Sequence, residues 1–311
     1  MSEFSLSAQP THSRWNRALS ARLRIAPGDT VHLECVDSSG AQVHPKMRLA
    51  EFLKIDRELI HALTGPIFVD GAEVGDVLQI DVLEVAHKGW GWSSVISGLG
   101  FLQERFAEPY CFLWQLQGAV SRSLEPAMVP LRPFCGVMGV APAEDGEIRT
   151  RPPGVFGGNM DVRELSTGAT LYLPVLNSGA LFSCGDAHAA QGDGEVCING
   201  IECPADVSLR FHLHKNRPLT GPVIESAAST RDGDADAWIV VESSPDAIGA
   251  ARAATSRMID LLADRWGFSD VHAYLLCSVA MQLRLSQVVN EPMVTVSAAI
   301  SKRVLPPRAL F

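Results

Sequence analysis

The densest group of reactive side chains in the sequence lies at residues 185–195, which read Gly-Asp-Ala-His-Ala-Ala-Gln-Gly-Asp-Gly-Glu. Carboxylates and an imidazole can ligate a metal ion or move protons, and the interleaved glycines let the backbone approach a ligand closely. Asp186 and His188 are two residues apart, so in an extended segment they project to one side, as two ligands of one ion must. The alternative is a hairpin connection, because Asp-Gly pairs also mark turns.

Two further segments place polar side chains beside glycines. Residues 153–161 end in Gly-Gly-Asn-Met-Asp, so Asn159 and Asp161 could bind a ligand or could simply close a turn. His61 stands shortly before the rigid Thr-Gly-Pro turn at residues 64–66, and a lone histidine is more often structural than a ligand.

Other reactive residues favour structural interpretations. His212 and His214 have the spacing of two ligands on one strand face, but they alternate with apolar residues as a solvated face does. Trp90 and Trp92 could line a pocket, although aromatic side chains more often fill a core. Cys184 could act as a nucleophile with the nearby histidine, yet its apolar flank favours a buried, inert thiol.

The composition limits the classes of partner. The chain has 311 residues with a formal charge of −9, and no basic patch interrupts this acidic balance, so we expect no nucleic acid and no membrane partner. No window has the 18 or more apolar residues of a membrane span, and the N-terminus has no secretory signal pattern. The seven cysteines contain no C-x-x-C pair and indicate free thiols in a reducing, cytoplasmic location.

Strand-like patterns dominate the first two thirds of the chain, and helices follow. Alternating or β-branched runs predict strands at residues 30–35, 76–85, 136–141, 170–175 and 207–213. A helix is predicted over residues 245–266 with Ser244 as its N-cap and Gly267 as its stop, and a second helix over residues 269–288. The segment 293–304 alternates like a closing strand.

These elements predict a β-rich α+β protein, because no βαβα alternation is present. We expect a β-rich portion over residues 1–220, with a possible subdivision near residues 65–135, and an α+β portion over residues 221–311. Residues 47–63 read as a short helix or an irregular insertion, and the aromatic-rich segment 89–118 has no clean period. Neither G-x-G-x-x-G nor a P-loop motif is present, so nucleotide cofactors have no support.

Taken together, the motifs resemble the acetamidase/formamidase family of amidohydrolases. The resemblance covers most of the chain and rests on the segments 63–78, 158–161, 170–175, 179–196 and 280–289, of which Gly185 to Glu195 is the most specific. It implies hydrolysis of a small linear amide to carboxylate and ammonia. It also implies β-sandwich and small β-barrel portions with a C-terminal α+β part, a helix near residues 280–289, a homo-oligomer, and a divalent metal ion that we expect to be zinc.

The resemblance suggests which side chains would hold the ion. We hypothesise that Asp186 and His188 are ligands and that His61 or Asp161 supplies a third, because carboxylates and imidazoles suit zinc and several other divalent ions. A remaining coordination position would then activate a water molecule.

Roles in the reaction follow from the same hypothesis. Glu195 is the predicted general acid/base, with Asp193 as the second choice, because a carboxylate beside the activated water can take its proton and pass it to the leaving nitrogen. Asn159 and Gln191 carry both donor and acceptor atoms and would position the amide substrate.

Two alternatives stay open at this point. The first is a family member that cleaves a larger or different amide, suggested by residues 39–63, which differ from the usual family pattern, and by the aromatic-rich segment 90–114. The second is a non-catalytic small-molecule or metal-binding β-protein on the same scaffold, although such a protein has no need of an acid/base carboxylate beside a ligand set.

Overall fold

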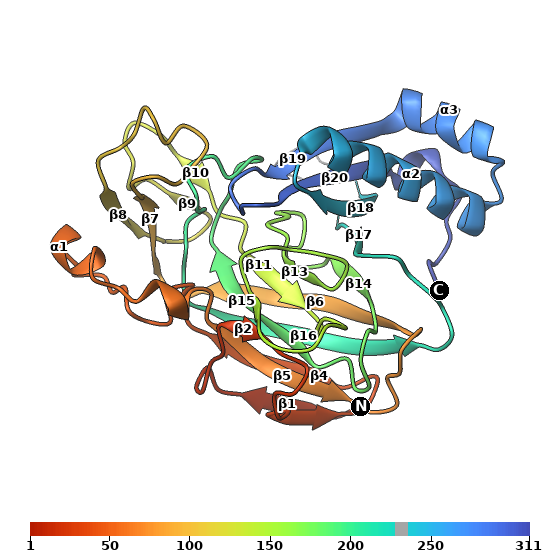
Figure 1. The fold of residues 1–311 in the computed structure, drawn as a ribbon, viewed down its shortest axis with the longest axis horizontal. Coiled ribbons are helices and arrows are strands. Elements are labelled where there is room, and N and C mark those ends of the chain that lie inside the picture. Colours follow the sequence, from red (N-terminus) through yellow and green to blue (C-terminus); the bar gives the residue numbers. More distant parts are fainter. Residues whose placement is uncertain (228–235) are drawn as a thin grey trace.

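The computed structural model describes residues 1–227 and 236–311, and two β-sheets form most of it (Figure 1). In spatial order the nine-stranded sheet consists of β1 (Glu3–Leu6), β4 (Thr30–Cys35), β16 (Ala205–His214), β6 (Val77–His87), β14 (Thr170–Pro174), β17 (Val223–Glu225), β18 (Ala237–Ser244), β20 (Val294–Ser301) and β19 (Met281–Gln287). The five-stranded sheet consists of β13 (Gly157–Asn159), β11 (Phe134–Gly139), β15 (Phe182–His188), β5 (Leu63–Val69) and β3 (Leu23–Ile25).

One apolar core joins the two sheets. Val31 and Leu33 of β4 in the larger sheet belong to the same buried cluster as Leu63 and Ile67 of β5 in the smaller sheet. Along β4 the buried residues alternate with exposed ones, as a strand with one face on a core requires. All five strands predicted from the sequence are present, and one of them, β11, lies beside β15 beneath the candidate site.

Two helices cover the strands of the larger sheet that come last in the chain, β18, β20 and β19 (Figure 1). Helix α2 (Ala247–Trp266) buries Ala250 and Ala254 against β18 and β20, and it ends at Gly267, whose φ of 74° suits a residue without a Cβ. The predicted N-cap, Ser244, is wrong: Asp246 caps the helix by accepting a hydrogen bond from the Gly249 N–H. Asp246 is the last residue before the helical turn, so only its carboxylate reaches that N–H.

The second helix is shorter than predicted. Helix α3 (Asp270–Ala280) ends where β19 begins, so the helix expected to continue to residue 288, and the helix implied at residues 280–289, are both wrong. From Met281 onward the chain alternates Met-Gln-Leu-Arg-Leu, which is the two-residue period of a strand, and Leu283 pairs with Ala298 of β20. The four-residue spacing of Leu275, Val279 and Leu283 does not mark a buried face, because all three are exposed.

The remaining elements are short. The aromatic-rich segment read as an excursion without a period contains two antiparallel strands, β7 (Trp90–Val95) and β8 (Tyr110–Gln115). The segment 47–63 holds α1 (Leu49–Phe52) and the 3-10 turn η1 (Arg57–Leu59). The others are β2 (Arg14–Trp15), β9 (Val120–Ser121), β10 (Val129–Pro130), β12 (Ile148–Arg149) and η2 (Lys302–Val304).

The sheet architecture bears on two expectations. Both large sheets have two open edges, so within the described residues the small β-barrel portion is not formed, and the β-rich α+β class is confirmed. Strand β17 follows residue 220 and pairs with β14, which precedes it, so the larger sheet continues across the proposed division into residues 1–220 and 221–311.

None of the helices described is long and apolar enough to cross a membrane.

Candidate metal and amide site

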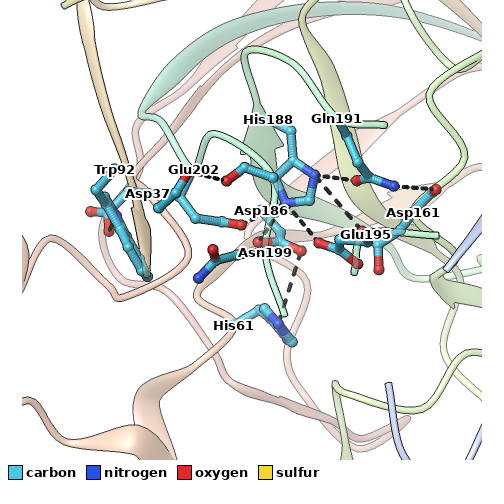
Figure 2. A network of polar contacts seen from close by, with 12 residues as sticks. Asp37, His61, Trp92, Asp161, Asp186, His188, Gln191, Glu195, Asn199 and Glu202 are labelled. Atoms are coloured by element: carbon cyan, nitrogen blue, oxygen red, sulfur yellow. Dashed lines mark hydrogen bonds and ion pairs between the residues drawn. The ribbon is translucent and has the colours of Figure 1, made fainter. Parts of the chain in front are cut away.

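The predicted cluster assembles at the end of β15, where side chains from three other segments join it (Figure 2). Asp186 and His188 come from β15 itself, and their side chains approach to 3.6 Å between Asp186 Oδ1 and His188 Nε2. His61, just before β5, brings its Nε2 to 3.9 Å from Asp186 Oδ2. Asp161, just after β13, places Oδ1 4.0 Å from His188 Nδ1. Four predicted ligands therefore meet in one place.

Two glutamates complete this cluster. Glu195 Oε1 lies 4.0 Å from His188 Nε2, and Glu202 Oε1 lies 2.9 Å from the same nitrogen. The sequence analysis missed Glu202, which is seven residues beyond the recognised string. Strand β7 holds it, because Trp92 and Glu202 exchange two backbone hydrogen bonds of 2.8 Å and the Trp92 indole N–H donates to Asp37. One signal was present in the sequence: a carboxylate inside the apolar run around residues 201–203.

The backbone at three of the carboxylates is unusual. Asp161, Asp186 and Glu195 have φ values of 51°, 55° and 49°, in the left-handed region that residues with a Cβ seldom adopt. All three are nonetheless well buried, so the surrounding packing holds them there. Such outliers concentrate at functional sites, where they aim side chains that a regular strand would turn away.

Gly136 of β11 makes room for two of these carboxylates. A Cβ built at this position would overlap Asp161 Oδ1 and would lie 2.9 Å from Asp186 Oδ2. We therefore expect Gly136→Ala to displace both side chains and to lower bound divalent metal and amide turnover together, by at least tenfold, since misplacing catalytic groups by about 1 Å can cost 10²-fold. Elemental analysis and ammonia release measure the two effects, and unchanged values for a folded variant would contradict this packing argument.

Several polar atoms of the cluster have no hydrogen-bond partner among the described residues. They are Asn159 Oδ1, Asp161 Oδ1, Asp186 Oδ1, His188 Nε2, Glu195 Oε2 and Glu202 Oε2. Leaving a buried polar atom unsatisfied is costly, so such atoms in one place point to a ligand. Two overlapping groups, Asp161–Asp186–His188 and His188–Glu195–Glu202, each bring their ligand atoms within 4.8 Å of one another. Carboxylate oxygens and an imidazole nitrogen match the donors of a divalent ion such as zinc.

The charges of the cluster are strongly coupled. Burial raises the pKa of Asp161 to about 7 and that of Glu202 to about 8, and burial together with the Asp161 charge raises the pKa of Glu195 well above its usual value. Burial alone would also raise the pKa of Asp186, but His61 and His188 hold it below its usual value. The carboxylates therefore compete for protons, and a cation among them would relieve their repulsion.

Other predicted residues have different surroundings. Asp193 lies outside the cluster, with its side chain 38% exposed and Oδ1 accepting a 2.9 Å hydrogen bond from the Arg163 Nε–H. Asn159 is buried with its Oδ1 unpartnered, whereas both ends of the Gln191 amide bond to protein atoms. The sequence analysis missed Asn290, whose amide donates to Asp161 Oδ2. Asn290 follows β19, far along the chain, and no local motif surrounds it.

The residues with structural interpretations also have clear positions. Cys184 is fully buried, and hydrogen bonding with Cys135 and Cys35, together with burial, raises its pKa well above the usual value, so it is a poor nucleophile. His212 lies 3.2 Å from Asp81 Oδ2 and His214 lies 2.6 Å from Gln79 Oε1, both on strands away from the cluster.

Comparison with known proteins shows the family of this chain. The model of the Acetamidase/Formamidase family matches residues 2–146 and 143–306. The chain belongs to this family. A putative formamidase of Schizosaccharomyces pombe is 27% identical over 354 residues, covering 90% of this chain and 86% of that protein. The resemblance seen in the sequence is thereby confirmed.

Solved structures of acetamidase/formamidase proteins share the fold. A predicted acetamidase/formamidase of Thermoanaerobacter tengcongensis superimposes with a TM-score of 0.90 at 29% identity, over 98% of each chain. An acetamidase of Bacillus halodurans gives a TM-score of 0.88 at 32% identity, over 96% of this chain and 98% of that one. The match therefore includes both sheets and the C-terminal helices.

Proposed function

We propose that this chain hydrolyses short linear amides, of the formamide or acetamide type, to carboxylate and ammonia with a metal-activated water. Membership of the Acetamidase/Formamidase family supports the reaction class, since relatives of this chain carry the names formamidase and acetamidase. The observation that carries the mechanism is the buried group of unpartnered oxygens and one imidazole nitrogen around His188. Native proteins leave few buried polar atoms unsatisfied, so a gathering of them in one place supports a ligand site.

The residues that would hold the ion are His188 and the carboxylates around it. Carboxylate oxygens of Asp186 and Glu202 lie within 3.6 Å of His188 Nε2. His61 lies 3.9 Å from Asp186, and Asp161 lies 4.0 Å from His188 Nδ1. When bound, a divalent ion, zinc in our proposal, would supply an activated water and would polarise the amide carbonyl. Carboxylates that repel one another without a cation become ligands that share its charge.

Proton transfer falls to Glu195. Burial and Asp161 raise its pKa, so its carboxylate can accept the proton of the attacking water and release it again to the departing nitrogen. Protonating that nitrogen matters because an amide anion is a very poor leaving group. Asn159 Oδ1 is buried and unpartnered, so it can accept a hydrogen bond from the substrate N–H and orient the amide.

The experiment that tests this function is ammonia release from purified protein, before and after chelator treatment and metal readdition. We expect formamide and acetamide to release ammonia, the chelator to reduce the rate by at least 10²-fold, and a divalent ion to restore it. Ammonia release that resists the chelator would overturn the metal-activated water but would still support amide hydrolysis. No ammonia release from any amide by the metal-loaded protein would overturn the hydrolytic function.

A larger amide is a second candidate, favoured by one observation. A cavity of about 900 Å³ adjoins the site, and its lining includes Gln191 and the aromatic residues Tyr110, Phe112 and Trp114. This volume lies toward the upper end for pockets that enclose drug-sized ligands and far exceeds what acetamide needs. Faster ammonia release from aryl or long-chain amides than from acetamide would support this candidate over the first.

A further inference from the structure

The side-chain amide of Gln191 is held at its nitrogen end by two backbone carbonyls. Nε2 donates to the Asp161 carbonyl oxygen at 2.9 Å and to the Ser286 carbonyl oxygen at 3.3 Å. Neither carbonyl can donate a hydrogen bond, so the amide is fixed with its NH₂ group toward them. The Ser286 carbonyl also accepts from the Gly194 N–H at 3.1 Å, which ties the end of β19 to the same loop.

Fixing the nitrogen end determines what the oxygen end does. Gln191 Oε1 lies 2.7 Å from His188 Nδ1, and an amide oxygen can only accept (Figure 2). Nδ1 therefore carries the hydrogen and donates it to Gln191. The remaining ring nitrogen, Nε2, faces the carboxylates of Asp186, Glu195 and Glu202, of which Glu202 Oε1 is the nearest at 2.9 Å.

We infer that Gln191 is a positioning residue, which keeps Nδ1 of His188 protonated so that Nε2 is the nitrogen that ligates the ion. The inference rests on the proposed metal-dependent function and changes the role expected for Gln191, which was to bind substrate. Both N–H groups of its amide and one lone pair of its oxygen already bond to protein atoms, which favours a positioning role over substrate binding. Glutamine thus does here what a carboxylate or carbonyl does beside many metal-bound histidines.

The two ring nitrogens of His188 have different carboxylate neighbours. Asp161 approaches the ring from Nδ1, at 4.0 Å, whereas Asp186 and Glu202 approach Nε2 at 3.6 Å and 2.9 Å. An ion on Nε2 therefore has Asp186 and Glu202 as its nearest carboxylates, with Glu195 farther away at 4.0 Å. An ion on Nδ1 would have to displace the Gln191 oxygen.

The test compares two substitutions at this position in the full chain. Gln191→Met fills similar space without an acceptor, and we expect zinc affinity, measured by competition with a chelating dye, to fall by about 10- to 100-fold. Gln191→Glu keeps an oxygen opposite Nδ1 but sets its second oxygen against the Asp161 and Ser286 carbonyls, so we expect a zinc affinity between those of Gln191→Met and the wild type. Gln115→Met, on the exposed residue of β8, is the matched control and should bind zinc like the wild type.

A second measurement uses the unaltered protein and so does not depend on how the variants fold. In the zinc-loaded wild type, long-range ¹H–¹⁵N correlation should show His188 with a protonated Nδ1 and a metal-bound Nε2. Zinc on Nδ1, or wild-type zinc affinity in folded Gln191→Met, would overturn the inference and leave the proposed function intact. A wild type that binds no divalent ion would overturn both.

Discussion

Replacing His188 with alanine is expected to remove bound divalent metal and to reduce amide hydrolysis below detection. His188 is the residue common to both candidate ligand groups, and its Nε2 lies within 4.0 Å of carboxylate oxygens of Asp186, Glu195 and Glu202. Without His188 the ion would lose the one imidazole ligand that both candidate groups share. Elemental analysis of the purified variant gives the metal content, and ammonia release gives the turnover.

The control for this variant is His212→Ala. His212 lies on β16, outside the cluster, and pairs with Asp81 at 3.2 Å with its side chain 36% exposed. We expect that variant to keep wild-type metal content and turnover, since exposed ion pairs contribute about 0–1 kcal/mol. A thermal melt must accompany both variants, because an unpaired buried carboxylate can itself unfold a protein. A folded His188→Ala protein with full metal content would remove His188 from the ligand set.

The local part of the site could be predicted from the sequence, because its residues stand close together in the chain. Asp186, His188 and Glu195 lie within ten residues, and their types alone indicate metal or proton chemistry. His61 and Asp161 were also predicted, and the structure brings both beside Asp186 or His188. Whether each acts as a ligand stays a prediction.

What the sequence could not supply is long-range geometry. Asn290 reaches Asp161 across 129 positions of chain, and Gly136 matters only because β11 pairs with β15 beneath two carboxylates. Strand register is set by tertiary packing, which no local pattern records. Asp193 belongs to the motif, but its side chain forms an ion pair with Arg163 outside the cluster, which the motif alone does not indicate.

The fold likewise has parts that local sequence predicts and parts that it does not. Strands with a clean alternation, such as β4, and the helix α2 with its apolar face and glycine stop were predictable from local sequence. The boundary between α3 and β19 was not, because Leu275, Val279 and Leu283 fit a helical period while pairing with β20 decides the structure from Met281 onward. The division into portions near residue 220, the oligomeric state and the cytoplasmic location stay predictions.

Replacing Glu195 with glutamine is expected to lower kcat by about 10²–10⁴-fold, the usual contribution of a general acid/base, while the protein keeps its metal. The substitution preserves shape and removes only the proton-accepting charge. Glu195 is well buried, with Oε2 unpartnered, and its Oε1 lies 4.0 Å from His188 Nε2, farther than the 2.9 Å of Glu202. That longer distance favours proton transfer for Glu195 and ligation for Glu202.

Asp193→Asn is the matched control, because it makes the same carboxylate-to-amide change two residues away. Asp193 is partly exposed and bonded to Arg163, so we expect its loss to change kcat less than twofold, as loss of an exposed pair should. If Glu195→Gln loses turnover but keeps its metal, while Asp193→Asn keeps a normal kcat, Glu195 has the acid/base role and is not a ligand. Loss of metal in Glu195→Gln would instead make Glu195 a ligand, and equal turnover in wild type and Glu195→Gln would assign the proton transfer to another group.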